Sequence, residues 1–237
     1  MPAPPALLTR LLCLLPALAL CLAAGAAPAQ PRDYRLDPVH TRVLVAIDHA
    51  GFSQALGTVS GSEGSLAFDP DDWVDARVDV QIPLQKLDFG DAEWNRTVLA
   101  RGLLDAGRYP LARFTSTRVV ARDPGHFDVE GVLELHGRRR PLTLAVTFNQ
   151  LKHHPLPPFR STAGFSATAT FSRAAFGIDA WPGVIGDQVQ LRIEAEAVRG
   201  RGSGPDDAAA AGDADGPLPP PDGPATPPPP SSPPALQ

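Results

Sequence analysis

The sequence predicts an all-β domain with one main helix, in which about eight antiparallel strands curl into a barrel. Segments of alternating apolar and polar residues recur at short, regular spacing between residues 43 and 197, a pattern typical of sandwiches and barrels. One stretch, residues 90–104, instead places apolar residues at helical spacing. A single apolar-faced helix in such a chain must cover something, and we expect it to cap one end of the curled sheet.

The predicted helix has charges that suit its ends. Asp91 and Glu93 fall in the expected first turn, where carboxylates complement unpaired N–H groups, and Arg101 falls near the expected end, where a cation complements unpaired carbonyls. Glycine and proline follow at Gly107 and Pro110 and stop the helix. The expected apolar face comprises Trp94, Val98, Leu103 and Leu104.

The strands are read from alternation, and the last one is the clearest. Val189, Leu191 and Ile193 face one way, with Gln190 and Arg192 between them. A long segment after residue 52 holds three glycines, which in a strand mark the bends that a closing sheet needs. The predicted strands cover residues 43–47, 52–68, 76–84, 112–121, 126–135, 142–148, 165–171 and 189–197.

The two ends of the chain differ from this domain. Arg10, an apolar run and Ala27-Pro-Ala29 form the pattern of a cleaved signal peptide over residues 1–29, which predicts export to the periplasm. From residue 200 to 237 the chain is rich in Pro, Ala and Gly, and Val198 is the last β-branched aliphatic residue. Such a segment buries too little apolar area to order itself, so a disordered tail is expected beside one domain at residues 30–199.

Composition excludes several functions. Both cysteines, Cys13 and Cys21, fall in the predicted signal peptide, so the mature domain has no thiol for catalysis, disulfides or zinc. The net charge of −5 gives no electrostatic case for nucleic acid. The six histidines show no metal-ligand spacing, and we find no catalytic triad or phosphate loop.

Several short motifs occur in one order along the domain. They are Tyr34-Arg-Leu-Asp-Pro-Val-His-Thr41, Asp91-Ala-Glu-Trp-Asn95, the segment 109–117, Gly131-Val-Leu-Glu-Leu-His-Gly137, and Phe171-Ser-Arg-Ala-Ala-Phe-Gly-Ile178 followed by Gly186-Asp-Gln-Val189. As a set they resemble the YceI-like family of periplasmic polyisoprenoid-binding proteins. The resemblance implies an eight-stranded lipocalin-like barrel that encloses an isoprenoid tail, with the polar head near the mouth.

The expected site is therefore an apolar pocket inside the barrel. Alternation alone does not say whether the inward side chains fill the interior or line a cavity, and the resemblance favours a cavity. His49 shares parity with the apolar face, and His49 and His40 are the candidate head-group contacts. The alternatives are a histidine of the barrel wall at His49 and a turn residue that bonds nearby backbone at His40. The candidate pocket residues are Val43, Val45, Ile47, Val78, Val80, Ile82, Trp94, Val98, Phe114, Leu133, Leu135, Leu144, Val146, Leu191 and Ile193.

Three functional interpretations follow. The first is a non-enzymatic periplasmic carrier for a polyisoprenoid lipid, of the isoprenoid quinone or polyprenyl phosphate type, with no cofactor other than that lipid. The second is an enzyme or redox partner that acts on a quinone-like head group, and the third is a packed barrel that serves only structure. The first interpretation is compatible with transient contact with the membrane or a membrane donor, and with a monomer or a homodimer.

Overall fold

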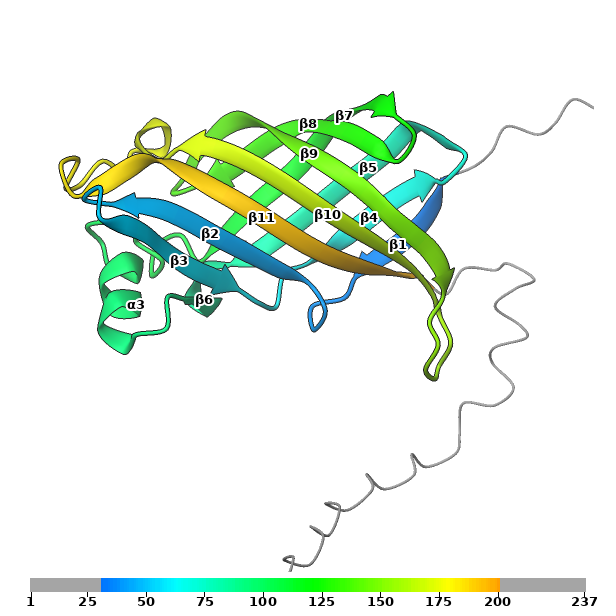
Figure 1. Ribbon diagram of the computed structural model, residues 1–237, viewed down its shortest axis with the longest axis horizontal. Coiled ribbons are helices and arrows are strands. Elements are labelled where there is room, and N and C mark those ends of the chain that lie inside the picture. The colour runs from blue at the N-terminus through cyan, green and yellow to red at the C-terminus, as the bar shows by residue number, and fades with distance from the viewer. Residues whose placement is uncertain (1–30, 201–237) are drawn as a thin grey trace, which may run out of the picture.

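The computed structural model describes residues 31–200. The predicted signal peptide, and the predicted tail beyond residue 200, lie outside these residues. The described chain is built almost entirely of strands, with one α-helix, α3, and two short 3-10 turns, η1 and η2 (Figure 1). The elements are β1 (Arg32–Leu36), β2 (Arg42–His49), β3 (Ser53–Val59), β4 (Glu63–Asp69), β5 (Asp72–Pro83), η1 (Leu84–Lys86), β6 (Leu87–Asp88), α3 (Ala92–Leu99), β7 (Leu111–Asp123), β8 (His126–Leu135), β9 (Arg138–His153), β10 (Ser161–Ser172), η2 (Ala174–Phe176) and β11 (Ile185–Arg199).

The sheet closes on itself, which confirms the predicted eight-stranded antiparallel barrel. Neighbouring strands follow the order β1-β4-β5-β7-β8-β9-β10-β11, and β11 pairs again with β1. The closing pairs run from Tyr34 opposite Arg199 to Leu36 opposite Ala197. Closure leaves this ring without an open edge and directs alternate side chains of every strand into one interior.

Two positions in the ring are each filled by a pair of strands that lie end to end. Strands β1 and β2 both pair with β11. On their other side, β4 pairs with β1 and β3 pairs with β2. The predicted single strand 52–68 is therefore two strands separated at residues 60–62. Gly61 makes the break with a φ of 73°, and a Cβ at Gly64 would clash with the Asp79 carbonyl oxygen. Gly61 lets the chain turn where the sequence predicted a bend, whereas Gly64 lets β4 approach β5 closely.

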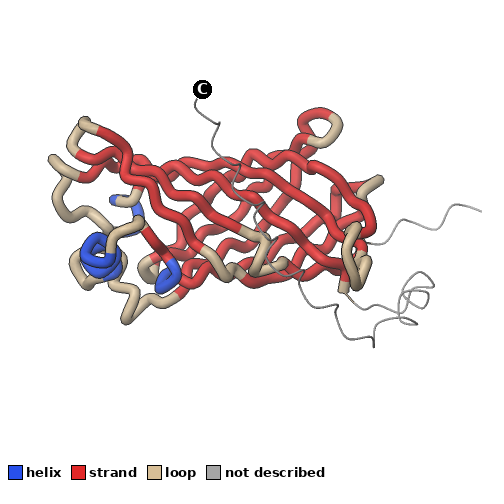
Figure 2. The backbone as a smooth tube through the Cα atoms, turned by 60° about the horizontal axis from the view of Figure 1, so that its bottom comes forward, coloured by secondary structure: helices blue, strands red, loops and turns tan. Residues whose placement is uncertain are grey.

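The helix lies at one end of the barrel, as predicted, but it is shorter than residues 90–104 (Figure 2). Asp91 caps it, because its Oδ1 accepts hydrogen bonds from the N–H groups of Glu93 and Trp94, both at 2.9 Å. The helix ends at Leu99, since Ala100 has an extended backbone. Arg101 and the Leu103-Leu104 pair therefore lie in the turns that follow. No helix within residues 31–200 is both long and apolar enough to cross a membrane.

The opposite end of the barrel is packed with aromatic rings. Phe68 stacks between Tyr34, at 4.4 Å between ring centroids, and Trp73, at 4.9 Å. Phe148 and Phe165 meet the same ring edge-on. Tyr34 and Phe68 are buried, so this end of the interior is filled by side chains. We call Tyr34, Phe68, Trp73, Phe127, Phe148 and Phe165 the aromatic plug.

Truncation of the plug should destabilise the whole barrel. Phe68 is only 2% exposed and contacts four other rings, so Phe68→Ala should lower the free energy of unfolding by about 3–5 kcal/mol. Urea unfolding followed by tryptophan fluorescence measures it. Val74→Ala is the matched control, because Val74 is 79% exposed and the change should stay within about 0.5 kcal/mol. Equal stability of the two variants would contradict a packed plug.

Candidate functional site

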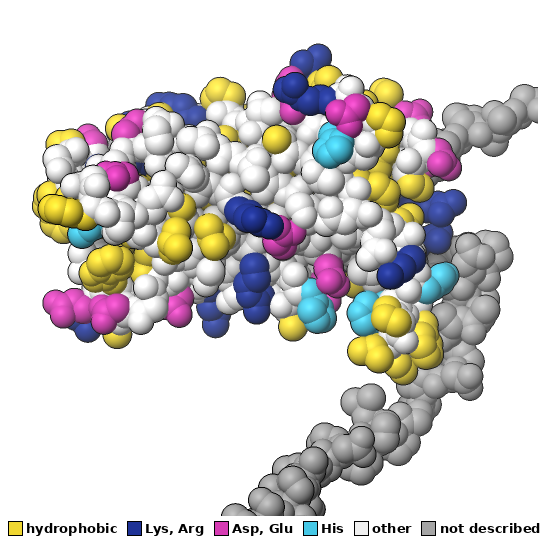
Figure 3. Space-filling model, in the orientation of Figure 1, with side chains coloured by type: hydrophobic (Ala, Val, Ile, Leu, Met, Phe, Trp, Pro, Cys, Tyr) yellow, Lys and Arg dark blue, Asp and Glu magenta, His cyan; other side chains and the backbone are white. Residues whose placement is uncertain are grey.

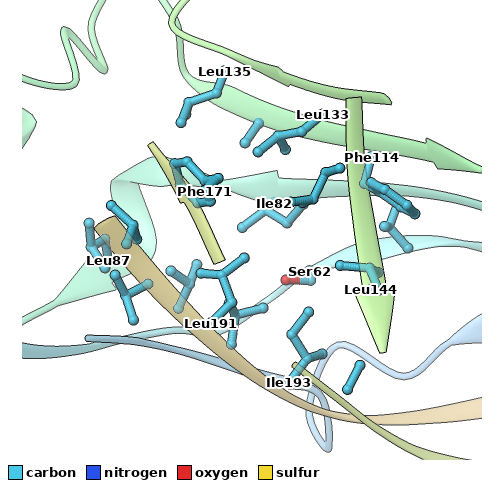
Figure 4. Close-up of a pocket in the computed structure, with 18 of the residues that line it drawn as sticks. Ser62, Ile82, Leu87, Phe114, Leu133, Leu135, Leu144, Phe171, Leu191 and Ile193 are labelled. Atoms are coloured by element: carbon cyan, nitrogen blue, oxygen red, sulfur yellow. The ribbon is translucent and has the colours of Figure 1, made fainter. Parts of the chain in front are cut away.

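The barrel encloses a cavity of about 860 Å³. Its wall is almost entirely apolar, and side chains from β2, β5, β7, β8, β9, β10, β11 and α3 contribute to it. In Figure 4 the labelled apolar side chains from several strands point toward one common space. The lining runs from Trp94 at the helix end to Phe68 and Trp73 in the plug, so the cavity follows the length of the barrel. Cavities of this size and polarity are typical of small-molecule sites.

The structure brings the predicted pocket residues together. All fifteen apolar residues named from the sequence line this cavity, including Trp94 and Val98 from the helix. The interior is thus a cavity along much of its length and packed side chains at the plug. Sequence reasoning missed the contribution of β10, where Phe165, Ala167 and Phe171 also line the wall. These residues alternate with Ser166 and the threonines that follow, and this alternation is the sequence signal that could have identified them as inward-facing.

Polar groups gather where the cavity reaches α3. The ring of His49 lies 5.5 Å from that of Trp94, and both line the cavity. Asp91 and Glu93 also line it and are exposed. Phe89 also packs against Trp94, with the ring centroids 6.3 Å apart. This end therefore offers hydrogen-bonding groups beside the apolar interior, and we call it the mouth.

His40, the second candidate head-group contact, is not among the residues that line the cavity. His40 lies in the exposed turn between β1 and β2, and its Nδ1 is 2.9 Å from the Asp37 carboxylate. The hydrogen bond to Asp37 raises the pKa of His40 above its ordinary value. Burial tends to raise the pKa of Asp37, but hydrogen bonds from His40 and from the backbone outweigh it and lower the pKa.

Donor atoms of Asp37, His40 and Glu196 lie within 4.8 Å of one another, a grouping that sequence reasoning missed. Glu196 comes to this turn because β11 passes alongside both β1 and β2. The carboxylate of Asp37 already accepts from the N–H groups of Val39 and His40 as well as facing the imidazole. These contacts of Asp37 stabilise the turn between β1 and β2.

A buried arginine holds the loop beside the mouth. Arg173 is 4% exposed, and its guanidinium donates to four backbone carbonyls, those of Ile178, Ala180, Ile185 and Gly186, at 2.7–2.9 Å. A buried cation is tolerated because its N–H groups find acceptors. Arg173 is the arginine of the motif Phe171-Ser-Arg, and the structure gives it this positioning role, which the sequence did not reveal.

A closed antiparallel barrel with an apolar interior and a polar mouth defines the class of an internal-cavity binding barrel. The YceI-like domain model matches residues 34–197, and the chain belongs to this family. A UPF0312 protein of Vibrio parahaemolyticus is 32% identical over 180 residues, which cover 75% of this chain and 93% of that protein. A UPF0312 protein of Pseudomonas savastanoi pv. phaseolicola is 33% identical over 180 residues, which cover 75% of this chain and 91% of that protein.

Solved structures share the fold at lower identity. BcnA of Burkholderia cenocepacia superposes with a TM-score of 0.62 at 21% identity, over 68% of this chain and 98% of that chain. A protein described as a polyisoprenoid binding domain from Saccharophagus degradans superposes with a TM-score of 0.53 at 13% identity, over 70% of this chain and 98% of that chain. These likenesses show that the barrel architecture is shared.

Removal of the buried guanidinium should destabilise the barrel through the mouth loop. Arg173→Met leaves four carbonyls without their donor, so the free energy of unfolding should fall by at least ~3 kcal/mol. Arg173→Lys keeps the charge but loses the planar fork of the guanidinium, so its free energy of unfolding should lie between those of the wild type and Arg173→Met. Urea titration measures both, with the exposed Arg139→Met as control. A loss below ~1 kcal/mol for Arg173→Met would show that the loop does not depend on this side chain.

Proposed function

We propose that this protein is a non-enzymatic carrier that binds a polyisoprenoid lipid inside the barrel. The cavity itself carries the proposal, because about 860 Å³ of apolar space extends along the barrel and suits an elongated hydrocarbon tail with methyl branches. Membership of the YceI-like family, and the likeness to a domain described as polyisoprenoid-binding, support the same ligand class. Ligands of the isoprenoid quinone and polyprenyl phosphate types both carry such a tail.

The polarity of the two ends gives the ligand a direction. Polar side chains at the mouth, with His49 and Glu93 among them, suit a head group, whereas the plug presents mainly aromatic rings to a tail end. Apolar area removed from water supplies the binding energy, at roughly 25 cal/mol per Å² before association costs. The signal-peptide pattern of residues 1–29 supports a periplasmic site of action.

A charge placed inside the cavity should abolish lipid binding in a protein that stays folded. Leu191 lines the cavity from β11, so the carboxylate of Leu191→Glu would face apolar surface that the lipid must cover. Burial of that charge under a hydrocarbon tail is costly, and affinity for radiolabelled nonaprenol in detergent micelles should fall about 100-fold or more. Circular dichroism checks that the variant is folded.

The neighbouring Gln190 provides the matched control. It is exposed on the outer face of the same strand, so Gln190→Glu adds the same charge without facing the lipid and should bind like the wild type. Undiminished nonaprenol binding by a folded Leu191→Glu protein would place the site outside the barrel. Failure of the wild type to bind any prenyl lipid would refute the carrier function.

A further inference from the structure

Large apolar side chains are exposed around the mouth. Phe52 is 90% exposed, Trp181 56%, Val184 46% and Trp94 44%. Figure 3 shows apolar side chains on the surface at the end of the barrel where α3 lies. A soluble surface rarely gathers several such groups without a function. We call these four residues the apolar rim.

Contacts between the segments show that the four rim residues come from segments that lie next to one another. The N–H of Ala50 donates to the carbonyl of Val184 at 2.6 Å, which joins the turn that carries Phe52 to the loop that carries Trp181. His49, one residue before that turn, contacts the ring of Trp94. Trp94, Trp181 and Val184 also line the cavity, so the rim continues directly into its apolar wall.

The backbone holds two of these segments in an uncommon conformation. Ala50 and Gly51 have φ values of 56° and 73° in the three-residue hairpin loop, residues 50–52, between His49 and Ser53, and Phe52 is the last residue of this loop. Trp181 has a φ of 51°, which is unfavourable for a bulky side chain. Arg173 fixes the Trp181 loop through the carbonyls on both sides of it, at Ala180 and Ile185. The tertiary structure thus keeps a tryptophan exposed at some energetic cost.

We propose that the apolar rim is a docking surface for a lipid bilayer, on which the protein exchanges its ligand. The proposal rests on the proposed function, since a polyprenyl lipid resides in membranes and must reach the cavity through apolar contact. A bilayer fits the rim better than a protein partner does, because the rim is continuous with the cavity and tryptophan favours the membrane interface.

The charges at the mouth select the kind of bilayer. Asp48, Asp91 and Glu93 line the cavity there. Arg173 also lines it at this end, but its guanidinium is buried and already hydrogen-bonded to backbone carbonyls. Anionic lipid recruits basic surfaces. The rim should therefore favour electrically neutral membranes over anionic ones.

Vesicle flotation of the full chain tests this docking surface. The wild type should associate with pure phosphatidylcholine vesicles, and less with vesicles that contain one part in about three of phosphatidylglycerol. Phe52→Ser with Trp181→Asn should weaken association about tenfold or more, because it removes two large apolar groups, and asparagine tolerates the backbone at position 181. Absence of wild-type flotation would overturn the proposal.

The β9–β10 loop offers a matched control at the other end of the barrel (Figure 1). Leu156 and Phe159 are 63% and 53% exposed, and Phe159 has a φ of 53°. Leu156→Ser with Phe159→Asn should leave vesicle association unchanged. Loss of association in this control, with the rim variant still bound, would overturn the proposal in favour of the loop. If the wild type is a dimer in sedimentation velocity and the rim variant is a monomer, the rim is a protein interface, and the proposal is also overturned.

A second measurement separates docking from ligand binding. Phe52 does not line the cavity, so Phe52→Ser alone should bind nonaprenol in micelles like the wild type but float less well with vesicles. If Phe52→Ser binds nonaprenol normally, and both this variant and the double variant float as well as the wild type, the docking surface is refuted. The proposed function would then still stand. Absent micelle binding by the wild type would refute the proposed function, whatever the vesicles show.

Discussion

The closing hydrogen bonds between β1 and β11 are the interaction on which the rest of the structure depends. Without the pairing of Tyr34 with Arg199 and of Leu36 with Ala197, the sheet would be an open curl whose inner face required another layer. Once it is closed, the inward side chains of eight strand positions share a single interior. The interior side chains do not fill that space, and the cavity is the consequence.

The two ends of this interior are built differently, and the difference gives the barrel a direction. At one end large rings stack across the barrel, centred on Phe68, and occupy the space. At the other end a short helix lies over the opening, tied down by Asn95, whose side chain bonds both Asp88 and the N–H of Phe89. The lining of this end mixes Trp94 with carboxylates and a histidine. A ligand with an apolar tail and a polar head therefore has one favourable orientation.

Alternation along the strands was enough to predict which side chains face the interior, because parity survives errors in strand boundaries, whereas the expectation of a cavity came from the family resemblance. Leu191 and Ile193 face inward whichever residue begins β11. Features that depend on pairing between distant strands were not predictable in the same way. The plug forms because register places Phe148 opposite Phe165, and no local pattern gives that register.

Three features of the structure do not follow from local sequence patterns. The helix was predicted through Leu104 because helical spacing of apolar residues continues past its end, whereas the backbone leaves the helix at Ala100. His40, a candidate head-group contact, lies in a turn outside the cavity lining, where its imidazole is hydrogen-bonded to the nearby Asp37. The positioning role of Arg173 is not predictable from the sequence, because its partners are backbone carbonyls, which no residue type marks.

Native mass spectrometry of the full chain, purified from a bacterial host without added lipid, tests the central claim most directly. The account predicts a second species heavier than the polypeptide by one lipid, which collisional activation releases and whose fragments show the five-carbon repeat of an isoprenoid. Leu191→Glu prepared in parallel should show the bare polypeptide mass. A bound species without isoprenoid repeats, or a wild-type protein that carries no lipid under conditions that preserve noncovalent complexes, would contradict the account.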